Sequence, residues 1–286
     1  MPKKKVLVVG SDGQLGKEIQ DLEKENKNII FSFTDATSLD ITKKKLMSKF
    51  FNNNNFDYCI NCAAYTDVEK AEADRVKAYQ VNVEGVENLA KNCLKYEVKL
   101  IHISTDYVFD GNSTTPYKEE DIKNPINYYG KTKLLGERII QEQLKKYFIV
   151  RSSWLYGKYG NNFVKIMIQL SKNKTTIEVV NDQIGVPTNV KDLAEFILYL
   201  IGSKNEKYGI IHFSNQGQAT WYDFAKEIFE ILKSKVQVIP VTSKEYPTSA
   251  KRPTYSVLNN GKAIQITNFK FRNWKFALKE YIKTNY

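Results

Sequence analysis

Short apolar runs rich in β-branched residues alternate with helical patterns through the first half of this 286-residue chain, and this alternation restricts the fold more than any other feature. Apolar runs of about four to eight residues are typical of buried strands, and apolar residues three and four apart are typical of amphipathic helices. Strands that alternate with helices predict βαβ units and right-handed crossovers. We therefore expect an α/β fold of the Rossmann type, a doubly wound parallel sheet. The expected strands are 5–10, 29–35, 57–64, 99–109 and 147–157, and the expected helices are 16–25, 42–51, 72–96 and 128–144.

The pattern loosens after about residue 153. Residues 161–172 and 220–233 are predicted to form amphipathic helices, the second with Thr220 as its N-cap. We expect a first domain over residues 1–152 and a smaller C-terminal domain over 153–286. Residues 188–215, a helix followed by "GIIHFSN", are expected to return to the parallel sheet of the first domain.

Composition argues against several classes of protein. A net charge of +11 could suggest nucleic acid, but only five of the 43 basic residues are arginine and the lysines are scattered. Mean hydropathy is −0.45, and no apolar run reaches the roughly 18 residues that a membrane helix needs. The run after "MPKKK" ends at Gly10 and is too short for a signal peptide, which needs roughly 7–15 apolar residues. We expect a cytoplasmic protein that binds neither nucleic acid nor membrane.

The three cysteines give no disulfide framework. Cys59 and Cys62 match the C-x-x-C spacing, but they lie in an expected strand, where residues three apart point to opposite faces. No redox pair and no metal site are predicted.

Three glycines of "GSDGQLG", Gly10, Gly13 and Gly16, follow the first expected strand and open a helix. Glycine allows a tight turn and the close approach of a pyrophosphate, which then faces the helix N-terminus. The alternative is a plain turn between strand and helix. Asp35 ends the second expected strand, where a carboxylate can accept the ribose hydroxyls of adenosine. No basic residue follows before Lys43, which favours NADH but leaves NADPH open, so residues 1–152 are expected to bind NAD(P).

A tyrosine and a lysine in "YYGKTK", residues 128–133, are candidates for catalysis. Residues four apart share one face of a helix, so Tyr129 pairs with Lys133, whereas the residue four after Tyr128 is Thr132. A phenol with a pKa of about 10 is a poor acid–base catalyst at neutral pH until a neighbouring ammonium stabilises the phenolate. Two incidental residues on a lysine-rich helix are the alternative. The position of the pair, behind the glycine loop and the fourth strand, favours catalysis.

The end of the fourth expected strand offers a third group. "HISTDYVFDG" places Ser104, Thr105 and Asp106 where parallel sheets bind their ligands. We expect Thr105 to hydrogen-bond a substrate carbonyl. The alternatives are that Ser104 has this role, or that Thr105 only caps the following turn.

Seven motifs together carry a family resemblance. The set resembles the extended short-chain dehydrogenases/reductases, and among them the dTDP-4-dehydrorhamnose reductases. The resemblance runs from about residue 5 to beyond 280. The motifs, in chain order, are "GSDGQLG", "NCAAYTDVEKAE", "STDYVFDG", "YYGKTKLLGE", "RSSWLYG" with "GNNF", "NDQIGVPT" and "RPTYSVLN".

This resemblance implies that NADPH or NADH reduces the C4 ketone of a dTDP-linked 4-keto-6-deoxy sugar, dTDP-4-dehydro-L-rhamnose, to give dTDP-L-rhamnose. It implies that Tyr129 donates the proton, that Lys133 lowers the pKa of Tyr129 and holds the nicotinamide ribose, and that Thr105 orients the ketone. Residues 153–286 would bind the substrate. A homodimer is a possible assembly.

The resemblance also implies two sets of contacts. Arg252 suits a diphosphate because a guanidinium bonds phosphate oxygens in pairs. Asp40 has an alternative role as a helix cap, and Trp154 as a core residue. The expected cofactor contacts are Gly10, Gly13, Gln14, Leu15, Gly16, Asp35, Asp40, Ile41, Ala63, Ala64, Thr66, Tyr129 and Lys133. The expected substrate contacts are Val68, Thr105, Asp106, Tyr107, Trp154, Asn162 and Arg252.

A few residues help to distinguish this chain from proteins of the same superfamily that have other functions. Sugar 4,6-dehydratases use a Thr-Asp-Glu triplet, and this chain has Tyr107 in place of the glutamate. A 4-epimerase uses the same tyrosine–lysine pair and stays open, as does a reductase for another nucleotide 6-deoxy sugar. The regulatory subunit of methionine adenosyltransferase shares fold and motifs without catalysis, but the intact Thr105, Tyr129 and Lys133 favour an enzyme.

Overall fold

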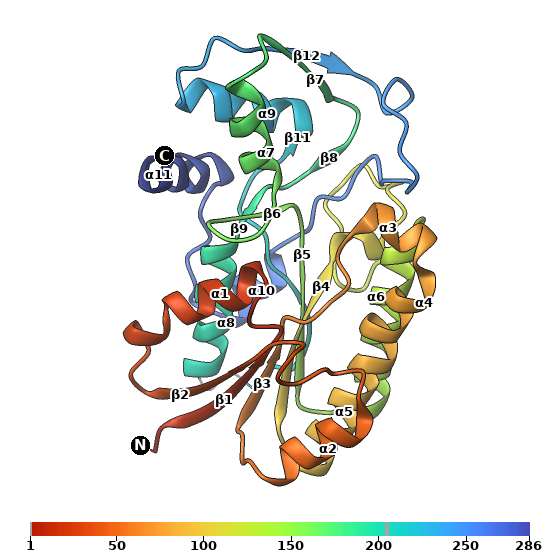
Figure 1. Ribbon diagram of the computed structural model, residues 1–286, viewed down its shortest axis with the longest axis vertical. Coiled ribbons are helices and arrows are strands. Elements are labelled where there is room, and N and C mark those ends of the chain that lie inside the picture. Colours follow the sequence, from red (N-terminus) through yellow and green to blue (C-terminus); the bar gives the residue numbers. More distant parts are fainter. Residues whose placement is uncertain (1, 204–205) are drawn as a thin grey trace.

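Six parallel strands form the central sheet in the computed structural model, which describes residues 2–203 and 206–286 (Figure 1). Their order is β10-β5-β4-β3-β1-β2, which confirms the predicted doubly wound sheet. The chain leaves β1 toward β2 and then returns to the other side of β1 as β3. This reversal opens a crevice beyond the carboxyl ends of β1 and β3, where doubly wound folds bind ligands. The strands are β1 (Lys4–Val9), β2 (Ile29–Thr34), β3 (Tyr58–Asn61), β4 (Lys99–Thr105), β5 (Tyr147–Ser152) and β10 (Gly209–His212).

Two hydrophobic layers enclose this sheet, because successive side chains of each strand point to opposite faces. Val6 and Val8 of β1 pack in one layer with α1 and α8, whereas Leu7 and Val9 pack in the other with α2, α5 and α6. Figure 1 shows α2, α5 and α6 on one side of the sheet and α1 and α8 on the other. These helices are α1 (Gln14–Asp21), α2 (Lys44–Asn52), α5 (Val86–Lys95), α6 (Tyr128–Gln143) and α8 (Val190–Gly202).

The helix predicted over 72–96 is divided in the structure. It begins earlier, as α3 (Val68–Ala73), and continues as α4 (Arg75–Tyr79), the π-helical turn η2 (Gln80–Gly85) and α5. Asp74 breaks the first junction with non-helical dihedral angles, φ −97° and ψ 53°. In the π-helical turn, the Asn82 amide donates to the Tyr65 carbonyl at 3.0 Å and accepts from the Tyr65 N–H at 2.9 Å. These bonds tie the turn to the loop after β3, which a local helical pattern does not reveal.

All five expected strands end earlier than predicted, and the fourth and fifth differ most. After β4, the short helix η3 (Asp106–Val108) turns the chain, and after β5 the residue Trp154 takes a left-handed φ of 44°. Both deviations occur at the carboxyl ends of the strands, on the side of the sheet where the crevice lies. The other short elements are η1 (Glu23–Glu25), β6 (Leu155–Tyr156), β8 (Ile184–Gly185), β9 (Thr188–Asn189), β11 (Ala219–Thr220) and α10 (Gly261–Ile266).

A second, smaller core lies beyond the sheet. Tyr156, Phe224 and Trp274 are among its buried residues. Thr220 caps α9 as predicted, in a reciprocal capping box with Asp223. The elements around this core are α7 (Phe163–Ser171), β7 (Thr176–Val180), α9 (Trp221–Ile231), β12 (Gln237–Val241) and α11 (Trp274–Asn285), with β7 and β12 paired in parallel. No helix of residues 2–203 and 206–286 is long and apolar enough to span a bilayer.

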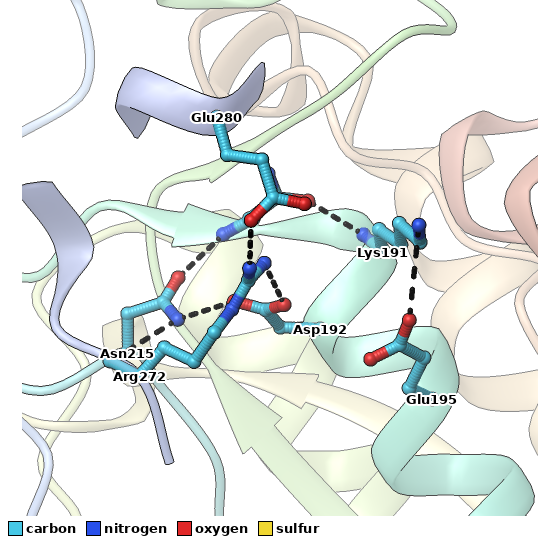
Figure 2. A network of polar contacts seen from close by, with 7 residues as sticks. Lys191, Asp192, Glu195, Asn215, Arg272 and Glu280 are labelled. Atoms are coloured by element: carbon cyan, nitrogen blue, oxygen red, sulfur yellow. Dashed lines mark hydrogen bonds and ion pairs between the residues drawn. The ribbon is translucent and has the colours of Figure 1, made fainter. Parts of the chain in front are cut away.

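A polar network joins α11 to α8 (Figure 2). The Arg272 guanidinium pairs with Asp192 of α8 and with Glu280 of α11. Asn215 donates to Asp192 Oδ2 at 2.6 Å and accepts from the Asn189 N–H at 2.8 Å. Since α8 packs against the sheet, this network holds the C-terminal helix at a defined position relative to the crevice.

Candidate active site

A cavity of about 640 Å³ lies at the carboxyl ends of the central strands. It brings together residues from the glycine loop, the ends of β3, β4 and β5, the start of α6 and the second core. Predicted site residues that line it are Gly13, Gln14, Leu15, Ala64, Thr66, Val68, Thr105, Asp106, Tyr107, Tyr129, Lys133 and Trp154. Ser104, the alternative to Thr105, also lines it, and the lining residues that were not predicted are Cys62, Ile103, Ser152, Ser153, Leu155, Gly160, Asn161 and Trp221.

The glycine loop forms a cradle at the start of α1. Gly10 has a positive φ of 70°, and a Cβ there would lie 2.5 Å from the Ala63 nitrogen. A Cβ on Gly16 would lie 2.4 Å from the Cα of Ser11, so both glycines permit close backbone packing. A Cβ on Gly13 would meet only the Gly10 oxygen, at 3.4 Å, and would otherwise enter open space beside the cavity. Gly13 is also the N-cap of α1 and has no side chain to cap it. A pyrophosphate fits this space.

Three predicted cofactor residues lie away from the cavity. Asp35 Oδ1 accepts hydrogen bonds from the backbone and hydroxyl groups of Thr37 and Ser38, and these bonds, Ser38 first, lower the pKa of the carboxyl. Asp40 Oδ1 accepts from the Thr42 N–H at 2.9 Å and the Thr42 hydroxyl at 2.7 Å. Ile41 is 4% exposed and packs in the core. Asp35 therefore stabilises the turn after β2, Asp40 a second turn, and Ile41 the layer behind the crevice.

Helix α6 carries Tyr129 and Lys133 into the cavity. Asn127 caps the helix by accepting from the Gly130 N–H at 2.8 Å. A Cβ on Gly130 would lie 2.1 Å from the Tyr107 carbonyl oxygen, so glycine lets α6 begin directly against η3. This contact places Tyr129 beside Thr105, and both line the cavity. Burial raises the pKa of the Tyr129 phenol, and the Thr105 hydroxyl opposes that rise.

The Lys133 ammonium lies in a buried polar pocket. Its Nζ donates to the Ile103 carbonyl at 2.6 Å and lies 3.3 Å from His102 Nε2. His102 Nδ1 lies 2.9 Å from the Asn61 amide nitrogen, and the Asn61 amide oxygen accepts from the Ala63 N–H at 3.1 Å. Because the backbone N–H can only donate, it sets the direction of the Asn61 amide, so His102 Nδ1 is the acceptor.

It follows that the neutral His102 ring carries its hydrogen on Nε2, facing Lys133. Burial lowers the pKa of His102 well below its usual value, with Lys133 as the second cause, so the ring is neutral at physiological pH. Burial also lowers the pKa of Lys133, to about 8, although the Glu137 carboxylate opposes this. Lys133 is therefore an ammonium close to its titration point, next to a phenol.

Thr105 and Asp106 complete the group at the end of β4. Thr105 Oγ1 accepts from the Tyr107 N–H at 3.2 Å and donates to Asp106 Oδ1 at 3.0 Å. Asp106 is 2% exposed, and burial raises the pKa of its carboxyl to about 7. Its second oxygen, Oδ2, has no hydrogen-bond partner among residues 2–203 and 206–286.

Two indole rings form the wall that faces these residues. Trp154 stacks on Trp221 with ring centroids 3.6 Å apart and planes 8° apart. A Cβ on Gly185 would lie 2.5 Å from the Trp154 ring, so a glycine is needed where the ring passes. Trp221 was not predicted, although it directly follows the Thr220 cap and its position at the start of α9 was readable. Stacked indoles suit the apolar face of a sugar ring.

Two predicted substrate residues stand outside the cavity lining. Arg252 Nη2 lies 2.6 Å from Glu69 Oε1, and the guanidinium opposes the rise that burial causes in the pKa of Tyr107. Asn162 accepts from the Lys165 N–H at 3.2 Å as the N-cap of α7 and donates to the Gly157 carbonyl at 2.9 Å. Arg252 is thus next to the cavity wall, while Asn162 secures the second core.

The fold and this site together define a class. A doubly wound parallel sheet, a glycine loop at its switch point and a tyrosine–lysine pair one helical turn apart define an extended short-chain dehydrogenase/reductase. The family described as RmlD substrate binding domain matches residues 4–286. The chain belongs to this family, and the resemblance to dTDP-4-dehydrorhamnose reductases is confirmed.

Individual relatives agree over almost their whole length. A dTDP-4-dehydrorhamnose reductase of Aggregatibacter actinomycetemcomitans is 40% identical, over 96% of this chain and 97% of that protein. The crystal structure of a dTDP-4-dehydrorhamnose reductase from Clostridium acetobutylicum is 46% identical, with a TM-score of 0.93 over 98% of this chain and 99% of its own. That of the Bacillus anthracis enzyme in complex with NADP is 41% identical, with a TM-score of 0.93 over 99% of both chains.

Proposed function

We propose that this protein is an NADPH-dependent dTDP-4-dehydrorhamnose reductase, an oxidoreductase of dTDP-rhamnose biosynthesis that reduces the C4 ketone of dTDP-4-dehydro-L-rhamnose. The observation that carries the proposal is the convergence of Thr105, Tyr129 and Lys133 on one cavity with the glycine loop. Relatives that share the whole length of the chain bear this name, and one of them binds NADP.

The cofactor side of the site is the glycine cradle. We assign the pyrophosphate to the space beside Gly13 and the nicotinamide ribose to Lys133, whose two donors remaining after Ile103 suit ribose hydroxyls. Asp35 uses Oδ1 for its own turn, which leaves Oδ2 for the adenosine ribose. NADPH bound in this way supplies the hydride for C4 of the sugar.

The protein's own residues manage the proton. Thr105 orients the ketone oxygen toward Tyr129, and the Tyr129 O–H bond breaks as a new O–H bond forms on the sugar. The Lys133 ammonium stabilises the resulting phenolate. Hydride and proton together convert the ketone to an alcohol, and the stacked Trp154 and Trp221 rings exclude water from the face of the sugar.

The remaining substrate contacts follow from position. We place the sugar between Val68, Asp106, Tyr107 and Trp154, which line the cavity. Arg252 would exchange Glu69 for the diphosphate of the nucleotide. We further propose that residues 1–152 hold the cofactor and 153–286 the substrate, with β10 of the latter completing the sheet. A homodimer remains the assembly to test, by sedimentation velocity.

A substrate panel tests the proposed function. Purified protein is mixed with NADPH and dTDP-4-dehydro-L-rhamnose, and NADPH absorbance is followed while NMR identifies the product. We expect oxidation of NADPH and formation of dTDP-L-rhamnose, with slower turnover of UDP- and GDP-linked 4-keto-6-deoxy sugars and of NADH. Tyr128→Phe is the matched control, because Tyr128 packs under Arg75, 5.0 Å away, and should retain full activity. A folded protein that oxidises no NADPH with any of these sugars would support the non-catalytic alternative.

A further inference from the structure

The carboxyl group of Asp106 is enclosed without being fully hydrogen-bonded. Its residue is 2% exposed and lines the cavity, yet Oδ2 lacks a hydrogen-bond partner in the described parts of the chain. A buried carboxylate oxygen without a donor is costly, whereas a buried carboxylic acid is much less so. The geometry therefore favours an Asp106 that carries a proton at the cavity wall.

A line of neighbouring hydroxyl groups leads from this carboxyl to the candidate proton donor. Asp106 Oδ1 lies 3.0 Å from Thr105 Oγ1, and the Thr105 hydroxyl is close enough to Tyr129, in the same cavity, to lower the pKa of its phenol. The Tyr107 N–H donates to Thr105 Oγ1 at 3.2 Å, which fixes the oxygen between its two neighbours. A hydroxyl both donates and accepts, so it can pass a proton in either direction.

We propose that Asp106 is a catalytic residue that returns a proton to Tyr129 through the Thr105 hydroxyl after each turnover. This inference rests on the proposed reductase function and adds the source of the proton that the reaction consumes. It also gives Thr105 a second role, as the bridge between the acid and the phenol.

The proton transfers balance. In the chemical step, Tyr129 loses its proton to the new sugar hydroxyl and becomes a phenolate. The Thr105 O–H then breaks as Tyr129 regains its O–H, and the O–H on Asp106 Oδ1, the oxygen 3.0 Å from Thr105, breaks as Thr105 regains its own. Asp106 is left as a carboxylate and takes a proton from water that enters the cavity when product leaves. The sum is one proton from water for each ketone reduced, with no other reactant.

The direction of transfer follows from the relative acidities. Burial raises the pKa of Tyr129 far above that of Asp106, which is about 7, so the phenolate is the stronger base. The titratable groups facing Asp106 are Tyr107 of its own turn and Tyr129 of α6, while the Arg252 charge from the C-terminal region opposes the rise in the pKa of Tyr107. The nearby Ser256 hydroxyl favours the ionised form of Asp106 and so opposes part of the rise in its pKa. Above about pH 7 Asp106 is therefore increasingly ionised and has no proton to donate.

Stopped-flow kinetics of Asp106→Asn test the relay. The asparagine retains the size of the side chain but has no acidic proton. Tyr129 should therefore donate one proton and then remain a phenolate until another source returns the proton. We expect one equivalent of NADPH per site to be oxidised at close to the wild-type rate, followed by turnover at least tenfold slower. Asp106→Glu, which restores an acid, should recover much of the lost turnover. The matched control is Asp110→Asn, which changes an aspartate four residues away and should behave as wild type.

The pH profile separates this role from a purely structural one. Wild-type kcat should fall above about pH 7, where Asp106 loses its proton. In Asp106→Asn that fall should disappear and leave only the later fall near pH 8, where Lys133 titrates. A variant with a higher KM, unchanged kcat and the same pH profile would overturn the relay and make Asp106 a substrate contact. So would the absence of a burst with kcat within twofold of wild type.

Two further results keep the inference separate from its premises. If Asp106→Asn does not fold, wild-type protein in heavy water decides the question. The relay predicts a larger solvent isotope effect on steady-state turnover than on the first turnover, and equal effects contradict it. If wild type itself oxidises no NADPH with the sugar, the proposed function fails, whereas normal turnover in Asp106→Asn removes only the relay.

Discussion

Helix α6 carries two sets of buried ionisable groups that differ in how completely they are hydrogen-bonded. In its first turns, Tyr129 and Lys133 face a cavity, and Thr105 contacts Asp106 Oδ1 while Asp106 Oδ2 has no partner in the described parts of the chain. One turn beyond Lys133, Glu137 is 0% exposed and has a partner for each oxygen. Arg151 of β5 bonds Oε2 at 2.6 Å and Oε1 at 2.9 Å, and the Ser104 hydroxyl donates to Oε1 at 2.5 Å.

The two buried histidines repeat this contrast. His212 has its Nδ1 3.1 Å from the Tyr117 carbonyl, which can only accept, so Nε2 is free to accept from Arg151 at 3.4 Å. His102 has the opposite tautomer and directs its N–H toward Lys133. The His212 ring can therefore accept from its neighbouring cation, whereas the His102 ring cannot. Complete hydrogen bonding around Glu137 supports the fold, and incomplete hydrogen bonding around Lys133 and Asp106 leaves groups that can exchange protons.

The largest effect on activity is expected for Lys133→Met, which removes a cavity-facing charge and leaves the Glu137–Arg151 pair intact. Methionine preserves the buried stem and removes the ammonium, so kcat/KM for NADPH oxidation should fall by about 10²–10⁴. The free energy of unfolding should change by less than about 1.5 kcal/mol, because an unbranched apolar side chain fills the same space. Steady-state kinetics and urea denaturation check the two values. Wild-type kcat/KM in this variant would contradict the assignment of Lys133 to the reaction.

Breaking the buried ion pair between Glu137 and Arg151 should have the reverse effect, a loss of stability without a loss of kcat. Arg151→Met leaves the Glu137 carboxylate buried without its cation, which should lower the free energy of unfolding by about 3–5 kcal/mol. The folded fraction should keep a kcat close to wild type. Lys158→Ala serves as control, because it removes an exposed pair with Asp21, and it should leave stability within measurement error. Equal losses in both variants would show that burial of the pair is unimportant.

Asp106 should also affect stability as a function of pH. Its carboxyl has a folded pKa of about 7 and an unfolded pKa of about 4, so the folded protein binds the extra proton between these values. Its stabilising contribution is complete below pH 4 and is lost as pH rises to 7, by at most about 1.4 kcal/mol per pH unit. The buried His102 and His212 act in the opposite sense, since their folded pKa values are low and stability falls as pH drops below about 6.5.

The difference between wild type and Asp106→Asn isolates the carboxyl, because both histidines are common to the two proteins. Urea denaturation at several pH values should show this difference changing between about pH 4 and 7 and constant below. A difference that is flat across this range would mean that Asp106 is ionised in the folded protein.

The smallest effect is expected for Ser104→Ala. It removes one hydrogen bond to Glu137 but leaves both bonds from Arg151, so the free energy of unfolding should fall by about 1 kcal/mol. Ser104 precedes Thr105, so kcat should stay within a few-fold of wild type if the serine only supports the strand end. A loss of kcat as large as that in Lys133→Met would make Ser104 the residue that orients the ketone.

The sequence predicted the sheet, the glycine loop and the tyrosine–lysine pair, because each depends on residues close together in the chain. The order of the elements placed Thr105 toward the end of the fourth strand, where parallel sheets bind ligands, and helical spacing selected Tyr129 over Tyr128. The interruption at Asp74 and the π-helical turn were not predictable in this way, since the turn depends on Asn82 bonding a loop 17 residues earlier.

Long-range contacts account for the other omissions. The stack of Trp154 on Trp221 joins residues of different elements, and neither local pattern indicates it. The same is true of Glu137 and Arg151, which meet only when α6 packs against the sheet. Asp106 was predicted as a substrate contact by resemblance, but its proton and its open oxygen depend on three-dimensional burial.

Tyr129→Phe, studied by kinetics and by unfolding on the same preparation, tests most directly whether the cavity-facing groups of α6 serve catalysis and not stability. Removing the phenolic oxygen deletes the proposed proton donor and leaves the ring that packs on Tyr107, with centroids 6.1 Å apart. We expect kcat for reduction of dTDP-4-dehydro-L-rhamnose to fall by about 10²–10⁴ while the free energy of unfolding stays within about 1 kcal/mol of wild type. Full reductase activity in this variant would show that Tyr129 is not the proton donor.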